Sequence, residues 1–318
     1  MNANAALVTS HRETTTPHFA VALAAYNGME FIAEQIQSIL NQSNVDVSIF
    51  VSVDRSSDGT ELWVKQLALC ESRVRVLDDG HTFGGAAANF FWLLREIDLE
   101  GVDYFAFADQ DDIWMPDKLI RAHLQLQSSG ADGYSSNVTA FWPSGKRRLI
   151  NKAQPQREWD YLFEAAGPGC TYVMSIQLAR ALQVAVRTQV DTLQRLTFHD
   201  WFVYAYARSN GFKWIIDGYS SMLYRQHSAN QFGANSGMAP FIRRIRQLLS
   251  GEAFGQLFYM ARAVQLPYTH PVSRMMDGGA LGMIRLAMAA RRCRRKGSEQ
   301  LAFFISCIAG VFIKFPNQ

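Results

Sequence analysis

The chain lacks paired cysteines and any strong charge bias. Its four cysteines are scattered, and no two of them form a C-x-x-C pair: Cys70, Cys170, Cys293 and Cys307. This spacing predicts neither a zinc site nor a disulfide framework, and a reducing, cytoplasmic compartment is the expected location. The net charge is only +3, and so small a surplus predicts no nucleic-acid partner.

The sequence also has little of what membrane insertion and export require. Residues Met1 to Thr16 are polar and lack the basic-then-apolar order of a secretory signal, so we interpret residues 1–17 as a flexible arm. The longest late apolar run, Leu301 to Phe315, is shorter than the ~20 residues of a membrane-spanning helix. We expect this run to lie on a membrane rather than to cross one.

Short β-rich runs alternate with helical patterns through the first part of the chain. The expected strands cover residues 19–26, 47–53, 73–77 and 104–108, and the expected helices between them cover 32–40, 61–69 and 86–97. Near-continuous apolar strands separated by helices predict an α/β fold with a mostly parallel sheet flanked by helices.

Polar or acidic residues follow each of these four strands. They are Tyr26-Asn27-Gly28, Asp54 to Gly59, Asp78-Asp79-Gly80 and Asp109 to Asp112. In a parallel sheet ligands bind beyond the carboxyl ends of the strands. The sequence therefore predicts a binding site at this edge of the sheet.

The second half of the chain changes character twice. A helix is predicted from Met115-Pro116, followed by strands at 133–142 and 171–174, a helix at 198–210 and closing strands at 213–217 and 221–224. From about residue 237 the chain is helical, basic and amphipathic without strand signals, for example at 241–249 and 281–290. We predict a separate helical tail over residues 237–318.

Three carboxylates crowd the end of the fourth strand, at Asp109, Asp111 and Asp112. Their mutual repulsion is unfavourable unless a cation lies among them, and hard oxygen ligands favour Mn²⁺ or Mg²⁺. The alternative is a solvated acidic turn before the helix at Met115.

Five motifs, taken in order, resemble glycosyltransferase family 2. They are Ala24 to Gly28, Ser52 to Thr60, Ala108 to Leu119, His199-Asp200 and Tyr224 to His227. The resemblance spans roughly residues 18 to 233 and implies the GT-A fold, a Rossmann-like nucleotide half joined to an acceptor half. It predicts a catalytic domain at 18–236, with the nucleotide-sugar half at 18–130 and the acceptor half at 131–236.

The resemblance implies that Tyr26 and Asn27 adjoin the base and that Asp54 accepts the N3–H of uracil or thymine. The alternatives are a core tyrosine and an Asx-turn between Asp54 and Ser56 or Ser57.

Further donor contacts follow from the same resemblance. Asp109 would contact the ribose, and Arg225 the phosphates, because its guanidinium matches their geometry. Asn89 and the glycines Gly84 and Gly85 resemble the segment that passes near the nucleotide. Their alternative is an ordinary glycine-rich loop followed by a helix start.

The resemblance assigns the metal chiefly to Asp111, with Asp112 as a substitute because the run of carboxylates leaves the register open. His227 would complete the metal shell from a loop after the last strand. The alternative for His227 is a structural histidine.

Asp200 matches the family's general base, which would deprotonate the acceptor hydroxyl in an inverting displacement. Its alternative is a helix N-cap, and both roles are compatible. Gly169, Cys170 and Trp201 fall on the acceptor side, where Cys170 is expected to be a small packed residue rather than a nucleophile.

The implied function is an inverting, metal-dependent glycosyltransferase. The sequences of Asp109 to Trp114 and Tyr224 to His227 resemble those of bacterial rhamnosyltransferases of lipopolysaccharide or O-antigen synthesis, which favours dTDP-L-rhamnose as donor. The alternative donor is a UDP-hexose. The alternative function is that of a non-catalytic scaffold that binds nucleotide or membrane. No G-x-G-x-x-G follows the first strand, which argues against a dinucleotide-binding oxidoreductase.

The tail predicts reversible contact with an anionic membrane and a lipid-linked acceptor, on the inner face of the cytoplasmic membrane. The basic residues that support this flank apolar stretches: Arg243, Arg244, Arg246, Arg291, Arg292, Arg294, Arg295 and Lys296. The alternative is a tail whose apolar face packs on the catalytic domain.

Overall fold

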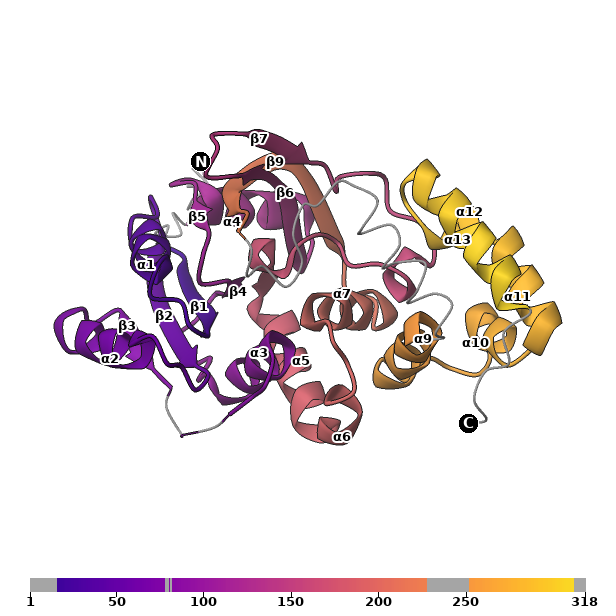
Figure 1. Ribbon diagram of the computed structural model, residues 1–318, viewed down its shortest axis with the longest axis horizontal. Coiled ribbons are helices and arrows are strands. Elements are labelled where there is room, and N and C mark those ends of the chain that lie inside the picture. The colour runs from indigo at the N-terminus through magenta and orange to yellow at the C-terminus, as the bar shows by residue number, and fades with distance from the viewer. Residues whose placement is uncertain (1–15, 78–79, 81, 228–251, 312–318) are drawn as a thin grey trace, which may run out of the picture.

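The computed structural model describes residues 16–77, 80, 82–227 and 252–311. One large sheet lies among helices, and helices from the end of the chain extend to one side (Figure 1). The strands are β1 His18–Ala25, β2 Asp46–Val53, β3 Val74–Val76, β4 Tyr104–Ala108, β5 Ile113–Trp114, β6 Gly133–Phe141, β7 Arg147–Ile150, β8 Val173–Ser175 and β9 Trp214–Arg225.

Helices connect these strands and end the chain. The α-helices are α1 Ile32–Leu40, α2 Thr60–Cys70, α3 Ala86–Glu96, α4 Lys118–Ser129, α5 Ile176–Thr188, α6 Val190–Leu193, α7 His199–Ser209, α9 Glu252–Ala263, α10 Pro271–Met276, α11 Gly279–Met288, α12 Ala290–Cys293 and α13 Gly297–Gly310. Two short 3-10 turns, η1 Asp160–Leu162 and η2 Gly169–Thr171, lie between β7 and β8.

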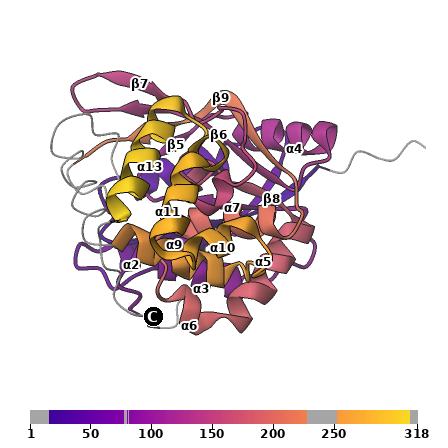
Figure 2. The ribbon, with the colours of Figure 1, turned by 90° about the vertical axis from the view of Figure 1, so that its right-hand side faces the viewer.

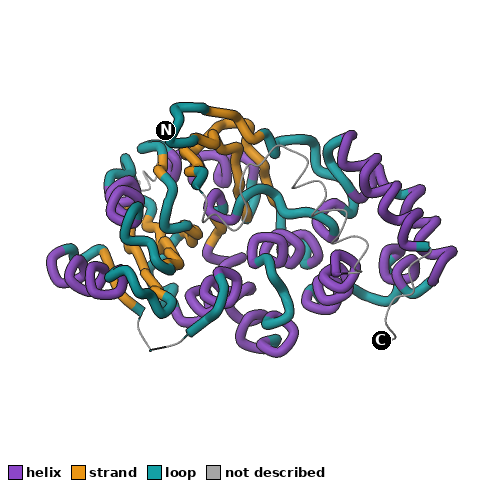
Figure 3. Tube along the Cα trace, in the orientation of Figure 1, coloured by secondary structure: helices purple, strands orange, loops and turns teal. Residues whose placement is uncertain are grey.

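The nine strands of the described residues form one sheet in the order β3-β2-β1-β4-β8-β6-β9-β5, with β7 paired to β6. Strands β1 to β4 are mutually parallel, so their carboxyl ends meet at one edge. β6 and β9 are also parallel, whereas β8, β7 and β5 pair antiparallel. Figure 3 shows the strands surrounded by helices, and the predicted α/β class with a mostly parallel sheet is confirmed.

Both faces of the sheet are buried. Phe19, Val21 and Leu23 of β1 pack with α1 and α4, whereas Ala20 and Ala22 face α3, α5 and α7. This alternation between two cores is what a strand covered on both faces requires, since successive side chains point in opposite directions.

Some elements differ from the sequence-based expectation. α4 begins at Lys118 rather than at Met115-Pro116, because the Met115 N–H still donates to the carbonyl of Ser221 in β9 (3.0 Å). The two expected closing strands are one strand, β9, which stays paired with β6 across irregular register shifts. The elements β5, β7 and α5 were not predicted.

The C-terminal helices share a core with the sheet. Met260, Val264, Leu286 and Cys307 are buried in the cluster that also contains α3, α5 and α7. Figure 2 shows α9 close to α7. The expected helical character is confirmed for 252–311, while the stretch 241–249 and the arm 1–15 lie outside the described residues. The domain boundaries at 17, 130 and 236 remain predictions. Among the described residues, no helix combines the length and apolar character needed to cross a membrane.

Three of the basic residues before α13 form ion pairs within the protein. The Arg292 guanidinium pairs with Glu158, Arg294 pairs with Glu299, and Arg295 is buried against Asp160. These three arginines therefore contribute to contacts within the protein, whereas the side chains of Arg291 and Lys296 are exposed to solvent. Arg243, Arg244 and Arg246 lie outside the described residues.

Candidate active site

The edge of the sheet is held together by Gln110, which lies between the predicted acidic ligands. Its side-chain amide accepts the Tyr26 N–H and donates to the Tyr26 carbonyl, both at 2.8 Å. A Cβ on Gly28 would lie 2.2 Å from Gln110 Oε1, so this approach requires glycine. Gln110 thus joins the loop after β1 to the loop after β4, a role that the sequence did not reveal.

Tyr26 and Asn27 lie at the end of β1 with different roles. The Tyr26 side chain is 57% exposed, which leaves its ring open for a base and excludes the core-tyrosine alternative. Asn27 adopts a left-handed conformation (φ 45°), and its Oδ1 accepts the Ser57 N–H (2.8 Å) while its own N–H donates to Ser56 Oγ (2.9 Å). Asn27 therefore fixes the relative position of the first two loops.

The Asp54 carboxylate organises the loop before α3. It is buried and accepts the N–H groups of Arg55 (2.8 Å), Phe83 (3.1 Å) and Gly84 (2.9 Å). The alternative of an Asx-turn to Ser56 or Ser57 is wrong, because the carboxylate instead holds the loop before α3. Two carboxylate oxygens provide about four acceptor positions, so one remains for a ligand.

Asn89 lies beneath this loop in the first turn of α3. Its Nδ2 donates to the Ser52 carbonyl (3.3 Å), and its buried Oδ1 has no hydrogen-bond partner in the described structure. An unsatisfied buried acceptor calls for an explanation, and a nearby ligand donor would provide one.

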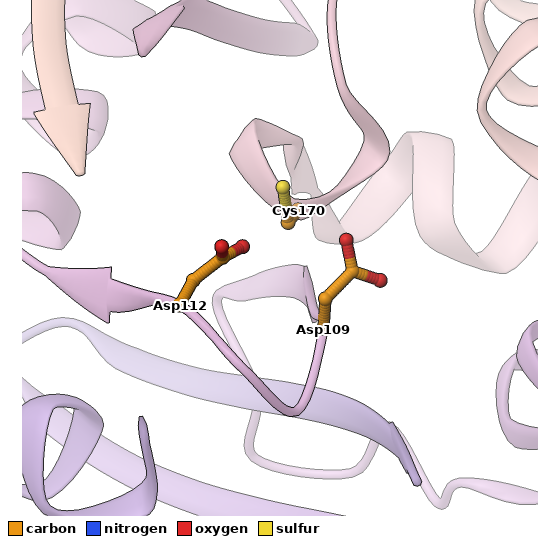
Figure 4. Close-up of side chains that lie close together, drawn as sticks. All are labelled: Asp109, Asp112 and Cys170. Atoms are coloured by element: carbon orange, nitrogen blue, oxygen red, sulfur yellow. The ribbon is translucent and has the colours of Figure 1, made fainter. Parts of the chain in front are cut away.

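The acidic loop between β4 and β5 divides its carboxylates. Asp109 and Asp112 point toward Cys170, and ligand atoms of all three residues lie within 4.8 Å of one another (Figure 4). Asp111 instead contacts His227, with 2.8 Å between its Oδ2 and Nε2. The predicted metal residues Asp111, Asp112 and His227 thus belong to two adjacent groups, because Asp109 and Asp112 lie at the two ends of the turn.

Burial strongly perturbs this cluster. Loss of solvent, aided by the charge of Asp111, raises the pKa of Asp109 to about 7 and that of Asp112 well above its usual range. Burial also raises the pKa of the Cys170 thiol, which keeps it a neutral packed group as expected. Asp112 Oδ2 has no partner among the described residues. Carboxylates destabilised in this way fit Mn²⁺ or Mg²⁺, which would restore their ionised form.

A buried lysine, Lys118, lies under the cluster and was missed from the sequence. Its Nζ donates to the Cys170 carbonyl (2.6 Å) and lies 3.3 Å from the Trp114 ring centroid. Burial lowers its pKa to about 7. The residue opens α4, so the sequence showed only an ordinary helical lysine.

Arg225 braces the closing strand against the acidic loop. Its backbone N–H donates to Asp112 Oδ1 (3.1 Å), and its Nε donates to the Asp111 carbonyl (2.8 Å). The guanidinium also pairs with Glu34 and lies 4.7 Å from the Phe31 ring centroid. Contact with phosphate remains a prediction for this residue.

Asp200 lies in the first turn of α7 rather than at its N-cap, which is Phe198. Its Oδ1 accepts the Trp201 N–H (2.7 Å). Burial raises the pKa of Asp200 to about 6, while the Trp201 N–H and the charge of Lys152 oppose the rise. The N-cap alternative is therefore wrong, and the group has the properties of a base active at neutral pH.

The η2 turn lies between Asp200 and the acidic cluster. A Cβ on Gly169 would lie 2.6 Å from His199 Nε2 and 3.1 Å from the Asp200 Cβ, so only glycine fits. The next residue, Cys170, belongs to the acidic cluster. The Trp201 Nε1–H donates to the Tyr161 carbonyl (3.0 Å), which fixes the position of its ring; its place on the acceptor side remains a prediction.

Comparisons with known proteins agree with this geometry. A profile described as "Glycosyl transferase family 2" matches residues 20–169. The chain is 38% identical over 297 residues to the dTDP-rhamnosyl transferase RfbG of Shigella flexneri, covering 91% of this chain and all of that protein. It is 31% identical over 159 residues to the glucosyltransferase WfgD of Escherichia coli, covering 49% of this chain and 58% of WfgD.

The fold resembles that of S. aureus TarS residues 1–349, solved in complex with UDP-GlcNAc. The TM-score is 0.53 at 13% identity, with 92% of this chain and 90% of TarS 1–349 covered. This likeness shows that the fold is GT-A-like. The chain belongs to glycosyltransferase family 2, and the predicted family and enzyme class are confirmed.

Proposed function

We propose that the protein is an inverting, metal-dependent glycosyltransferase that moves L-rhamnose from dTDP-L-rhamnose to a glycan or lipopolysaccharide acceptor. One observation carries the proposal: the η2 turn joins the acidic cluster, through Cys170, to the half-buried Asp200, through Gly169. The charges of Asp109 and Asp200 are close enough to raise the pKa of Asp109 further. A donor diphosphate near the cluster would therefore place its sugar next to Asp200.

The chemistry follows from the position of Asp200. A pKa of about 6 leaves the carboxylate mostly ionised at neutral pH and able to accept the proton of an acceptor hydroxyl. The oxygen of that hydroxyl forms a bond to the anomeric carbon as the bond to the diphosphate breaks. Attack from the face opposite the diphosphate inverts the anomeric configuration.

The metal would be held by Asp111 with Asp109, Asp112 and His227, on the two adjacent sides of the acidic loop. Bound there, Mn²⁺ or Mg²⁺ supplies positive charge that stabilises the departing diphosphate. Lys118 holds the carbonyl of Cys170 and so positions the turn against this loop.

Rhamnose is supported by similarity to RfbG, whose name specifies dTDP-rhamnosyl transfer, along nearly the whole chain. UDP-hexose remains the second candidate, since WfgD is named as a UDP-Glc-dependent glucosyltransferase and matches about half of this chain. Tyr26 and Asp54 suit either base, because thymine and uracil present the same N3–H.

We propose further that the acceptor is lipid-linked and that the protein binds the inner face of the cytoplasmic membrane from the cytoplasm. Exposed apolar side chains on two adjacent helices support this: Leu281 and Met288 on α11, and Leu301, Phe304 and Ile305 on α13 (Figure 2). Arg285, Arg291 and Lys296 are exposed in the same segment. Apolar residues with a basic rim suit an anionic lipid surface.

The metal requirement and stereochemistry test the proposal together. Incubation with dTDP-L-rhamnose, Mn²⁺ and an O-antigen-type acceptor should release dTDP and give a product whose anomeric configuration, read by NMR, is opposite to that of the donor. Excess EDTA should abolish turnover, and Asp111→Ala should lose most of it. Full turnover in EDTA, or retention of configuration, would refute the mechanism.

A further inference from the structure

A polar cavity of about 350 Å³ lies between β7, the loop that follows it and the start of α13. Its lining is mainly charged or amide-bearing: Arg148, Asn151, Lys152, Glu164, Lys296 and Glu299. None of these residues belongs to the acidic loop or to the predicted donor contacts. A cavity of this size accommodates a sugar-sized ligand, and its polarity suits hydroxyl and anionic groups.

The charges of the lining leave a positive excess. Both carboxylates already pair with arginines of the same region: Glu164 with Arg295 (3.3 Å) and Glu299 with Arg294 (2.8 Å). The backbone N–H of Lys152 donates to Asn137 Oδ1, but across the described ranges no hydrogen-bond acceptor is found for its ammonium group.

Lys152 lines this cavity and is half-buried. Burial lowers its pKa, and the charges of Glu299 and Glu164 only partly oppose the effect. Partial burial of an ammonium group without a hydrogen-bonded acceptor is unfavourable. An anion in the cavity would supply that acceptor.

The cavity adjoins the base through the segment before η2. A Cβ on Gly167 would lie 3.8 Å from the Lys152 Cβ, and a Cβ on Gly169, two residues later, would lie 3.1 Å from the Asp200 Cβ. Lys152 and Asp200 thus pack against the same short turn. Their charges interact as well, because Lys152 opposes the burial that raises the pKa of Asp200.

We propose that this cavity is an acceptor subsite, in which Lys152 binds a phosphate or carboxylate group of the acceptor saccharide. The inference rests on the proposed glycosyl transfer, since it assigns the second substrate of that reaction. A saccharide anchored here by its anionic group lies beside Asp200, while the donor occupies the other side of the η2 turn. The subsite combines the catalytic sheet with the C-terminal helices, which contribute Lys296 and Glu299.

Binding of simple sugar probes to the full chain tests this subsite. Glucose 1-phosphate, glucuronate and uncharged methyl glucoside are titrated by NMR with dTDP and Mn²⁺ in excess, so that the donor site is already filled. At least one anionic probe should bind the parent protein more tightly than methyl glucoside. Binding of the phosphate alone or the carboxylate alone identifies the acceptor group, and either result supports the subsite.

The decisive variant is Lys152→Met, with Lys146→Met as the matched control. Lys146 is an exposed lysine of the same hairpin and does not line the cavity. Lys152→Met should weaken binding of the anionic probe about tenfold or more, as expected for a lost hydrogen bond to a charged group, whereas Lys146→Met should not. Lys152→Gln provides a second, polar variant if the methionine protein does not fold.

The outcomes distinguish failure of the acceptor subsite from failure of the proposed glycosyl transfer. Unchanged binding of the anionic probe by the folded Lys152 variants, or equal binding of methyl glucoside by the parent, overturns the subsite even if dTDP still binds. Failure of the parent protein to bind dTDP with Mn²⁺ instead overturns the proposed function. Binding of dTDP should be the same in the parent protein and in the variants of Lys152 and Lys146.

Discussion

The proposed base, Asp200, also makes a local hydrogen bond that an asparagine at this position can keep. Asn is nearly isosteric and its Oδ1 can still accept the Trp201 N–H, so Asp200→Asn removes the base without removing the local bond. We expect this variant to fold, to melt near the parent temperature and to bind donor, with kcat reduced by ~10²- to 10⁴-fold. Retention of most of the parent kcat would exclude Asp200 as the base.

The raised pKa of Asp200 also predicts a pH profile. Below pH 6 the group is protonated and cannot act as a base, so kcat/KM should fall about tenfold per pH unit, and it should level off above pH 6. The residual activity of Asp200→Asn should lack this acidic limb. The same limb in both proteins would mean that another group controls the reaction.

The role of a residue could be predicted only where the residue belongs to a recognised motif. The resemblance of five motifs to glycosyltransferase family 2 was sufficient to single out Tyr26, Asp54 and Asp200 as candidates. Gln110 and Lys118 were missed, because an amide between aspartates and a lysine in a helix have no sequence signature. Their roles depend on which atoms the fold brings within hydrogen-bond distance, namely the Tyr26 backbone and the Cys170 carbonyl.

At the scale of elements, one buried ion pair fastens the segment before α13 to the sheet domain. The Arg295 guanidinium donates to Asp160 Oδ2 (3.1 Å) and to the Ala165 carbonyl (2.6 Å), and both charged side chains are fully buried. Arg295→Met leaves the Asp160 carboxylate buried with one arginine fewer. We expect a loss of about 3–5 kcal/mol, seen as a Tm lower by roughly 5–10 °C.

An exposed pair nearby provides the control for this prediction. Arg292 pairs with Glu158 at the surface and lies 3.6 Å from the Trp159 ring centroid, so Arg292→Met should cost at most about 1–2 kcal/mol. Replacing both buried partners, as Asp160→Leu with Arg295→Met, should recover part of the lost stability. Equal Tm values for the parent and Arg295→Met would mean that the pair does not hold the segment.

Helix and strand boundaries could be predicted where the hydrophobic periodicity was strong. They could not be predicted where pairing with a distant strand determines the element. The strands β1 to β4 followed directly from their apolar runs. The amphipathic spacing of α5 and its N-cap Ser175, whose side chain accepts the Leu178 N–H, were present in the sequence but were overlooked. By contrast, β7 is a charged edge strand, and its sequence has no signal apart from its pairing with β6.

For the whole molecule, the exposed face of α11 and α13 predicts binding to anionic lipid. Leu301→Glu with Ile305→Glu places like charges on side chains that are 62% and 58% exposed, so the fold should tolerate them. The parent should float with phosphatidylglycerol vesicles at low salt, and the double variant should not. Leu124→Glu, an equally exposed leucine on α4, is the control and should float.

Vesicle composition and salt complete that test. Neutral phosphatidylcholine vesicles should bind less protein, and binding should weaken with salt, because part of the attraction is electrostatic. A parent protein that stays with the soluble fraction at low salt would end the membrane proposal. The sequence predicted this contact from a basic run, yet Arg295 pairs with Asp160, 135 residues away, which no local pattern reveals.

The central claim is that this member of glycosyltransferase family 2 uses dTDP-L-rhamnose with a divalent cation, and selective thermal stabilisation tests it most directly. Tm is measured for the full chain with Mn²⁺ and dTDP-L-rhamnose or UDP-glucose. At 100 times its Kd a ligand adds about 2.7 kcal/mol of stability, so dTDP-L-rhamnose should raise the Tm by several degrees. The rise should vanish in EDTA and shrink for Tyr26→Ala. A larger rise with UDP-glucose, or none with either donor, would contradict the account.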